Sequence, residues 1–293
     1  MEFTEELFLH HFHAWMGREI DPEDVYMALM HESSSPVWVA QLVHMSRRHQ
    51  GRMKLFQRGI CGPLMERMHR MQRTDRRLRF CMFALAKLTT ETDFHPFTRA
   101  AIELLTRVMH AGGSVTLLTS TLKALGSLSV IPVISVYICA VQPMLQRVIL
   151  LSSHVPNPRC KQAAHRVLHG LCMHVPNLRV MQPLGVIPML ISELTPGSKH
   201  VLECLLAFSA HEAFHGEMRT YGILDALRGM MLPRCNPCIW PLLENLVKAD
   251  TAISCLFIPE LERVVMGTDE PLAVRITCTR MHAQAHFIQV RFY

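Results

Sequence analysis

A phrase of the form Leu-x-x-Leu recurs six times along this chain of 293 residues, with Met or Phe closing two of the copies. The copies begin at Leu42, Leu85, Leu125, Leu168, Leu205 and Leu243. Successive copies are 43, 40, 43, 37 and 38 residues apart. A spacing that stays near forty residues indicates a repeated supersecondary unit, and units of this length are helical repeats that stack into a solenoid.

A second phrase, rich in Gly, Ile and Pro, alternates with the first. It runs from Gly59 to Leu64, from Ala140 to Leu145, from Gly185 to Leu190 and from Gly222 to Leu227. Together the two phrases resemble armadillo repeats, in which Gly-Ile/Val-Ile-Pro-x-Leu opens the second helix and Ala-Leu-x-x-Leu closes the third. The resemblance covers roughly residues 35 to 284. Between residues 99 and 104 the second phrase lacks both Gly and Pro, and the related two-helix HEAT repeat is an alternative there.

The resemblance implies an all-α fold, a right-handed armadillo-like superhelical solenoid of about six repeats. We expect N-terminal capping helices in residues 1–34, repeats in residues 35–285, and a C-terminal tail in residues 286–293 that fits neither phrase. Asp21 and Asn157 each precede a proline. A capping side chain before proline predicts a helix start, because proline at the first helical position loses no hydrogen bond.

Composition suits stacked helices, with 49% hydrophobic and 18% charged residues. Ten cysteines are scattered through apolar runs, which predicts a reducing, cytoplasmic location, with the nucleus or cytoskeleton as alternatives. The apolar stretch from Leu125 to Val141 is close to the minimum length for a membrane span, but Pro132 interrupts it. We therefore expect a buried short first helix and no membrane insertion. We expect no cofactor, and the sequence does not define an oligomeric state.

The segment from His211 to His215 matches the HExxH motif of zinc proteases. On an α-helix the two histidines would share a face and could bind Zn²⁺, while Glu212 would activate water. Met218 and Tyr221 stand where the metzincin extension requires Gly and His. The motif also lies at a junction between repeats, which predicts a short first helix. A zinc hydrolase is therefore only a remote alternative.

Cys235 and Cys238 form a single CxxC, which is a weak metal or redox signal without a second pair. His10, His11 and His13 cluster on the first expected helix, and a polar surface is a simpler interpretation of this cluster than a metal site. The sequence shows no phosphate-binding glycine loop, nucleophile elbow or supported pair of catalytic carboxylates. We expect no enzymatic activity.

Residues 47 to 79 contain eleven Lys and Arg against two acidic residues, a net charge of +9, whereas the whole chain carries +6. Such a local positive field attracts phosphate or carboxylate polymers, and arginine binds both. An ordinary solvated helix surface is the alternative. The predicted basic patch consists of Arg47, Arg48, Arg52, Arg73, Arg76 and Arg77.

The resemblance places the third helices on the concave face. We take the third residue of each Leu-x-x-Leu phrase as exposed, including Ser127, Gly170 and Ala207, and count back by four. The predicted partner-binding groove consists of Arg79, Phe83, Lys87, Lys123, Arg166 and Lys199. The Trp and Asn ladder of the importin-alpha branch is missing except for Asn245. The pattern is more similar to the catenin-type branch, whose basic groove takes acidic ligands.

These observations predict a non-enzymatic scaffold that binds an acidic or phosphorylated protein segment in a basic groove, compatible with a place in a larger assembly. A nucleic-acid or ribonucleoprotein-binding module is the alternative, because the same arginines suit phosphates. Against it, Phe83 is the only aromatic side chain near the predicted groove that could stack on a base.

Overall fold

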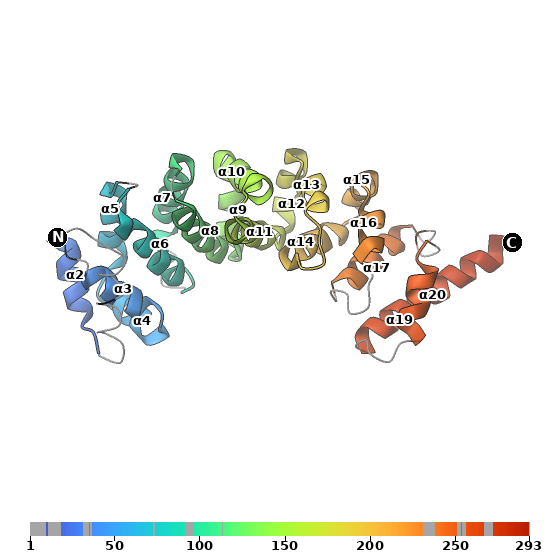
Figure 1. Cartoon of the computed structure of the whole chain (residues 1–293), viewed down its shortest axis with the longest axis horizontal. Helices are drawn as coiled ribbons and strands as arrows, with labels where there is room; N and C mark the ends of the chain where they lie inside the picture. Colours follow the sequence, from blue (N-terminus) through green and yellow to red (C-terminus); the bar gives the residue numbers. More distant parts are fainter. Residues whose placement is uncertain are drawn as a thin grey trace. The chain divides into compact units, whose positions relative to one another are not determined.

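The computed structural model describes residues 10, 19–31, 35, 37–72, 74–91, 96–112, 114–230, 238–250, 253, 256–266 and 272–292. Within these ranges all regular secondary structure is helical, as the sequence predicts. The chain divides into two compact units, Met1–His174 and Val175–Tyr293, each of which is described by itself (Figure 1).

The first unit contains two rows of helices. Its helices are α2 (Pro22–Met30), α3 (Val37–Ser46), α4 (His49–Gln57), α5 (Cys61–Arg70), α6 (Arg76–Leu88), α7 (Thr98–Ala111), α8 (Val115–Ser129), α9 (Pro132–Ala140), α10 (Gln142–His154) and α11 (Pro158–Cys172). Helices α3, α6, α8 and α11 pack against one another in consecutive pairs, and so do α2, α5, α7 and α10 (Figure 1). The first row consists of the third helices of the repeats and the second row of the second helices.

Capping side chains define where several helices begin. Asp21 accepts a hydrogen bond from the backbone N–H of Glu23, and Asn157 accepts two from the first turn of α11. Both predicted helix starts are therefore confirmed. Asp75 and Ser114 cap α6 and α8 in the same way, so each of these helices begins with a satisfied backbone donor.

Helices α8 and α11 approach each other closely at a glycine. A Cβ atom added at Gly170 would lie 2.0 Å from Oγ of Ser129, so only glycine permits this spacing. The Ser129 hydroxyl donates to the carbonyl of Gly126 at 3.0 Å. The prediction that Gly170 is exposed is therefore wrong, because this part of α11 packs directly against α8 and is buried.

Helix α9 is only half buried, which corrects the expectation of a buried first helix. Ile134, Ile138 and Cys139 face the core. Val133, Val136 and Tyr137 face outward, and Val133 is 82% exposed. This helix has apolar residues on both sides, and the repeat covers only one of them.

Among the described residues, no single helix meets the length and hydropathy requirements of a membrane span; α9 and α10 meet them together but are bent by 92°.

The second unit continues the pattern of short first helices and packed third helices. Its elements are α12 (Val175–Met181), the 3₁₀ helix η2 (Gln182–Leu184), α13 (Val186–Ser192), α14 (Lys199–Ser209), the 3₁₀ helix η3 (Glu212–Phe214), α15 (His215–Thr220), α16 (Ile223–Met230), α17 (Ile239–Ala249), α19 (Ile258–Met266) and α20 (Leu272–Phe292). Helix α14 packs against α17, and α17 against α20. Helix α20 includes residues 286–292 of the expected tail.

The glycines of the second sequence phrase have a backbone reason. Gly59, Gly185 and Gly222 have φ angles of 75°, 71° and 79°, a left-handed conformation that other residues adopt at a cost. Gly185 and Gly222 immediately precede α13 and α16, and Gly59 lies two residues before α5. The glycine therefore allows the sharp turn with which the second helix of a repeat begins.

Candidate functional site

Basic side chains occur on three successive third helices of the first unit. Lys87 on α6, Lys123 on α8 and Arg166 on α11 are exposed, and Arg79 on α6 is half-exposed. We call these four residues the third-helix row. The Arg166 stem lies over α8, because its Cγ atom is 3.6 Å from where a Cβ of Gly126 would stand. Neighbouring helices thus present cations on adjoining surfaces.

Phe83 lies between two cations at the α3 end of this row. Cζ of Arg47 and Nζ of Lys87 are each 5.9 Å from the centre of its ring. Cations at this distance from an aromatic ring are weakly attracted to it. Cζ of Arg79 lies 4.5 Å from the Phe80 ring in the same helix. The aromatic rings on α6 therefore help to position the charged groups of Arg47, Arg79 and Lys87.

Two members of the row, Lys123 and Arg166, lie in a part of the chain from which acidic residues are missing, a signal that the sequence prediction overlooked. Between Glu103 and Glu193 there is no Asp or Glu, but there are seven Lys and Arg. Among the residues that the structure describes, none of Lys87, Lys123 and Arg166 has an ion-pair partner. Counting Asp and Glu along the sequence would have revealed this region, which we call the acid-free segment (residues 104–174 within the first unit).

The predicted basic patch is more strongly neutralised than its sequence indicates. Nε of Arg52 lies 2.5 Å from the Glu91 carboxylate, and its Nη1 donates to the Ser46 carbonyl at 3.1 Å. The side chains of Arg52 and Glu91 are only 15% and 16% exposed. Burial would raise the pKa of Glu91, but hydrogen bonds from Arg52 and His49 outweigh it and lower that pKa. Arg52 therefore connects helices within the unit.

Four more basic side chains of residues 47–79 face a carboxylate. The pairs are Lys54–Glu19, Arg58–Glu23, Arg70–Glu66 and Arg77–Asp75. Glu19, Glu23 and Glu91 lie outside the segment, so including them lowers its net charge from +9 to +6. Arg48 and Arg76 are exposed, and Arg73 lies outside the described residues.

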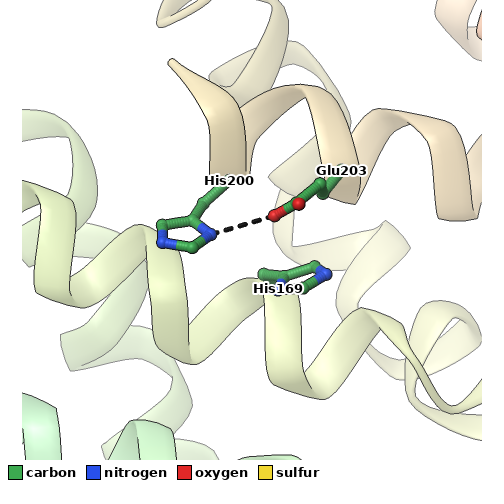
Figure 2. Close-up of side chains that lie close together, drawn as sticks. All are labelled: His169, His200 and Glu203. Atoms are coloured by element: carbon green, nitrogen blue, oxygen red, sulfur yellow. Dashed lines mark hydrogen bonds and ion pairs between the residues drawn. The ribbon is translucent and has the colours of Figure 1, made fainter. Parts of the chain in front are cut away.

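Lys199 belongs to the second unit, where α14 begins. It is exposed, and its Nζ lies 3.7 Å from the Glu203 carboxylate. Nδ1 of His200 is 3.0 Å from the other oxygen of Glu203 (Figure 2). The third residue drawn there, His169, belongs to the first unit. A local carboxylate thus offsets the charge of Lys199, in contrast to Lys123 and Arg166.

The HExxH segment does not form an α-helix. His211 has an extended backbone before η3, and His215 is the first residue of α15. The expected short first helix is therefore confirmed. His215 is buried, and its Nε2 lies 2.6 Å from the Ser209 carbonyl, a hydrogen bond in which the ring N–H donates. The two histidines consequently lack the one-turn relation of a zinc-protease helix.

Cys238, the second cysteine of the CxxC, is half-buried next to the start of α17. Burial, followed by the charge of Glu203, raises the pKa of its thiol. Cys235 lies outside the described residues, as do His11 and His13, whereas His10 is exposed. These positions bring no group of candidate ligands together among the described residues of the second unit.

Asn245, the one residue that fits the Trp and Asn ladder, and the neighbouring Trp240 are both engaged within the second unit. Nδ2 of Asn245 donates to Oγ of Ser209 at 3.0 Å, which links α17 to α14. Trp240 is 1% exposed and belongs to the core. Neither side chain is arranged like the exposed Trp and Asn pair that the importin-alpha resemblance would require.

No protein-family model and no curated protein sequence matches the chain. Solved structures do match. An engineered protein has a TM-score of 0.77 at 13% identity over 90% of this chain and 68% of its own. A designed armadillo repeat protein in complex with the peptide (KR)4 has a TM-score of 0.67 at 12% identity, over 79% of this chain and 99% of its own.

UNC-45 from Drosophila melanogaster matches 87% of this chain with a TM-score of 0.64 and 16% identity, and the match covers 35% of UNC-45. Identities this low carry information about the fold alone. The geometry of the repeats and these likenesses agree with the phrases in the sequence, and the chain has an armadillo-like helical solenoid fold.

Proposed function

We propose that this protein is a non-enzymatic scaffold that binds an acidic or phosphorylated protein segment along the third-helix row of its first unit. The observation that carries the proposal is the set of exposed cations on α6, α8 and α11, two of which lie in the acid-free segment. Cations without neighbouring carboxylates attract an acidic chain over a distance of about 8 Å at physiological salt.

The sign of the charge supports an acidic ligand. The designed armadillo repeat protein of similar fold is in complex with a basic peptide, (KR)4. The third-helix row of the present chain is itself basic, so a peptide of the opposite sign is the complementary partner. Arginine and lysine stems also offer apolar surface, which suits an extended peptide with mixed side chains.

The test uses two fluorescent peptides, (DE)4 and (KR)4, and anisotropy measurements at 50 and 200 mM salt. We expect (DE)4 to bind, (KR)4 not to bind, and the affinity for (DE)4 to fall as salt screens the charges. The double variant Lys123→Glu/Arg166→Glu should weaken (DE)4 binding by about a hundredfold, since like charges then face the peptide. Circular dichroism should be unchanged, because both side chains are exposed.

Arg99→Glu/Arg179→Glu is the matched control. It changes the net charge equally, at exposed positions outside the third helices. Equal loss in both variants, or no loss in either, would refute the row as the binding surface. An eight-nucleotide uridine RNA is tested in parallel. If it binds more tightly than (DE)4 and its binding depends on Lys123 and Arg166, a nucleic-acid-binding function replaces the scaffold.

A further inference from the structure

A hollow of about 420 Å³ opens at the turn between α5 and α6. Of the residues that the structure describes, three arginines surround it, two from the last turns of α5 and one from the first turn of α6. We call it the arginine hollow, and its polar lining consists of Arg67, Arg70, Gln72, Thr74, Asp75 and Arg77. Within the part of the lining that the structure describes, three cations against one carboxylate give a net charge of +2.

Asp75 holds part of this lining in place. Its carboxylate accepts hydrogen bonds from Nε and Nη2 of Arg77 at 3.0 and 2.7 Å, and from the backbone N–H of the same residue at 2.9 Å. Burial would raise the pKa of Asp75, but these hydrogen bonds and the charges of Arg77 and Arg67 outweigh it and lower that pKa. The guanidinium of Arg77 is therefore oriented before any ligand arrives, which reduces the entropy lost on binding.

Arg70 completes the hollow with a cation that can change partners. Its guanidinium pairs with Glu66 one turn earlier on α5, and both side chains are exposed. Exposed pairs of this kind contribute little to stability. A phosphoryl dianion carries more charge and one more acceptor oxygen than a carboxylate, so it competes effectively for such an arginine.

A second hollow of about 450 Å³ adjoins the first. The two share Met71, Gln72 and Thr74, so one short loop borders both. The second hollow is mostly apolar, with the buried side chains of Leu78 and Val108 in its lining. A site for an anion and a site for an apolar group thus lie side by side on one face of the first unit.

The α7 side of the second hollow is fixed to α5. Nη1 and Nη2 of Arg107 donate to the carbonyls of His69 and Met68 at 2.6 and 3.1 Å. These carbonyls belong to the last turn of α5, where a cation is favourable. Arg107, which borders the apolar hollow, therefore holds α7 against the end of α5, next to the loop that forms another border of the hollow.

We propose that the arginine hollow binds the phosphoryl group of a phosphorylated protein segment, and that the adjoining hollow takes an apolar side chain of the same segment. This inference rests on the proposed scaffold function and gives its ligand a point of attachment. A lining charge of +2 matches the nearly −2 charge of a phosphoryl group, and arginines bind its oxygens through paired N–H donors. The neighbouring hollow adds a preference for segments that carry an apolar residue close to the phosphorylated one.

The probes are capped seven-residue alanine peptides that carry a phosphoserine and, two residues later, a leucine. Matched peptides carry serine or glutamate in place of the phosphoserine, or alanine in place of the leucine. By calorimetry at 150 mM salt, we expect the phosphorylated peptide to bind at least about tenfold more tightly than the glutamate peptide. Inorganic phosphate should bind much more weakly than the phosphorylated peptide. Equal affinity would show that the hollow is a simple ion site and would refute the binding of a protein segment.

Arg67→Gln should remove the advantage of phosphorylation, and it spares the Asp75–Arg77 pair that caps α6. The control is Arg99→Gln, which removes one positive charge in the same way from an exposed arginine on α7 that borders neither hollow. Ala111→Phe should fill the apolar hollow, which Ala111 borders, and make the leucine and alanine peptides bind equally. If the phosphorylated peptide binds Arg67→Gln and the unaltered protein alike, the arginine hollow is not its site.

The two proposals fail separately. If Lys123→Glu/Arg166→Glu abolishes (DE)4 binding while Arg67→Gln leaves phosphopeptide binding unchanged, the scaffold function stands and the arginine hollow is refuted. If Arg67→Gln abolishes phosphopeptide binding while the row variant still binds (DE)4 at full strength, the hollow stands and the third-helix row is refuted.

Discussion

Two stretches of the first unit carry positive charge in opposite ways. Residues 47–79 contain eleven basic residues, but at least five of those that the structure describes pair with carboxylates, three of which come from other parts of the chain. The acid-free segment contains only six basic residues between residues 104 and 174, but no carboxylate at all. The electrostatic field of the first unit therefore depends on where acidic residues are missing as much as on where arginines are abundant.

The two stretches also differ in what holds their helices together. In residues 47–79, which we call the arginine-rich segment, ion pairs such as Arg52–Glu91 connect side chains 39 residues apart. In the acid-free segment, α8 and α11 are held by close packing at Gly170 and Ser129. In the arginine-rich segment, carboxylates hold arginines in defined positions, an arrangement that suits the proposed binding of a single anionic group. In the acid-free segment, the cations are exposed, an arrangement that suits the proposed binding of an extended acidic chain.

The largest effect should come from closing the contact between α8 and α11. Gly170→Ala places a methyl group 2.0 Å from Oγ of Ser129, so the helices must move apart. We expect the free energy of unfolding to fall by about 2–3 kcal/mol, measured by urea denaturation. Gly126→Ala is the control, because its nearest contact would be an ordinary 3.6 Å, and alanine in a helix gains about 0.5–1 kcal/mol. Similar effects of the two variants would contradict the packing argument.

A smaller effect is expected from breaking the main ion pair of the arginine-rich segment. Arg52→Gln removes the charge-assisted hydrogen bond to Glu91 and leaves that carboxylate largely buried. The expected loss is about 1–2 kcal/mol in the free energy of unfolding. Arg48→Gln, at an exposed neighbouring position, should change it by less than about 0.5 kcal/mol. If the two variants unfold at the same urea concentration, Arg52 has no structural role.

The smallest effect is a difference in pH dependence. The folded-state pKa values of Asp75 and Glu91 lie below their ordinary values of 3.8 and 4.5, so their stabilisation is complete above these values and is lost as the pH falls through the folded pKa values. Burial and the charges of Arg48 and Arg47 lower the pKa of His44, which adds a loss in the same direction below about its ordinary 6.5.

Hydrogen-exchange protection, corrected for intrinsic rates, should therefore decline with acid in α4 and α6 before it declines in α8 and α11. The acid-free segment has no carboxylate whose protonation could weaken it. A decline that begins in α8 and α11 would contradict the expectation that acid weakens the arginine-rich segment first.

Much of the fold could be predicted from local sequence because the repeat determines it locally. The capping roles of Asp21 and Asn157 and the position of the second phrase depend on residues within one turn. The pairing of Arg52 with Glu91 could not be predicted, since it depends on how separate helices pack. The burial of Gly170 has the same cause, because counting by four assigns a direction to a side chain but not the distance to the next helix.

The candidate site was only partly predictable for the same reason. Helix periodicity correctly predicts that Lys87, Lys123 and Arg166 are exposed. It does not distinguish a cation that faces solvent from one that a distant carboxylate neutralises, as happens to Arg52 and Arg58. The end of α20 could not be predicted either, because residues 286–292 fit neither repeat phrase.

If the third helices bind a ligand as proposed, Gly170 is a position at which no side chain can be used to discriminate between ligands. Each third helix offers a few outward positions where substitutions can change what is recognised, and α11 loses one of them to its contact with α8. Natural variation or engineering can alter the chemistry at Arg166 while the helix spacing is retained, whereas any side chain at position 170 would alter the spacing first. Substitutions on α11 can therefore change the exposed surface at Arg166 without moving the helices, whereas substitutions at Gly170 cannot.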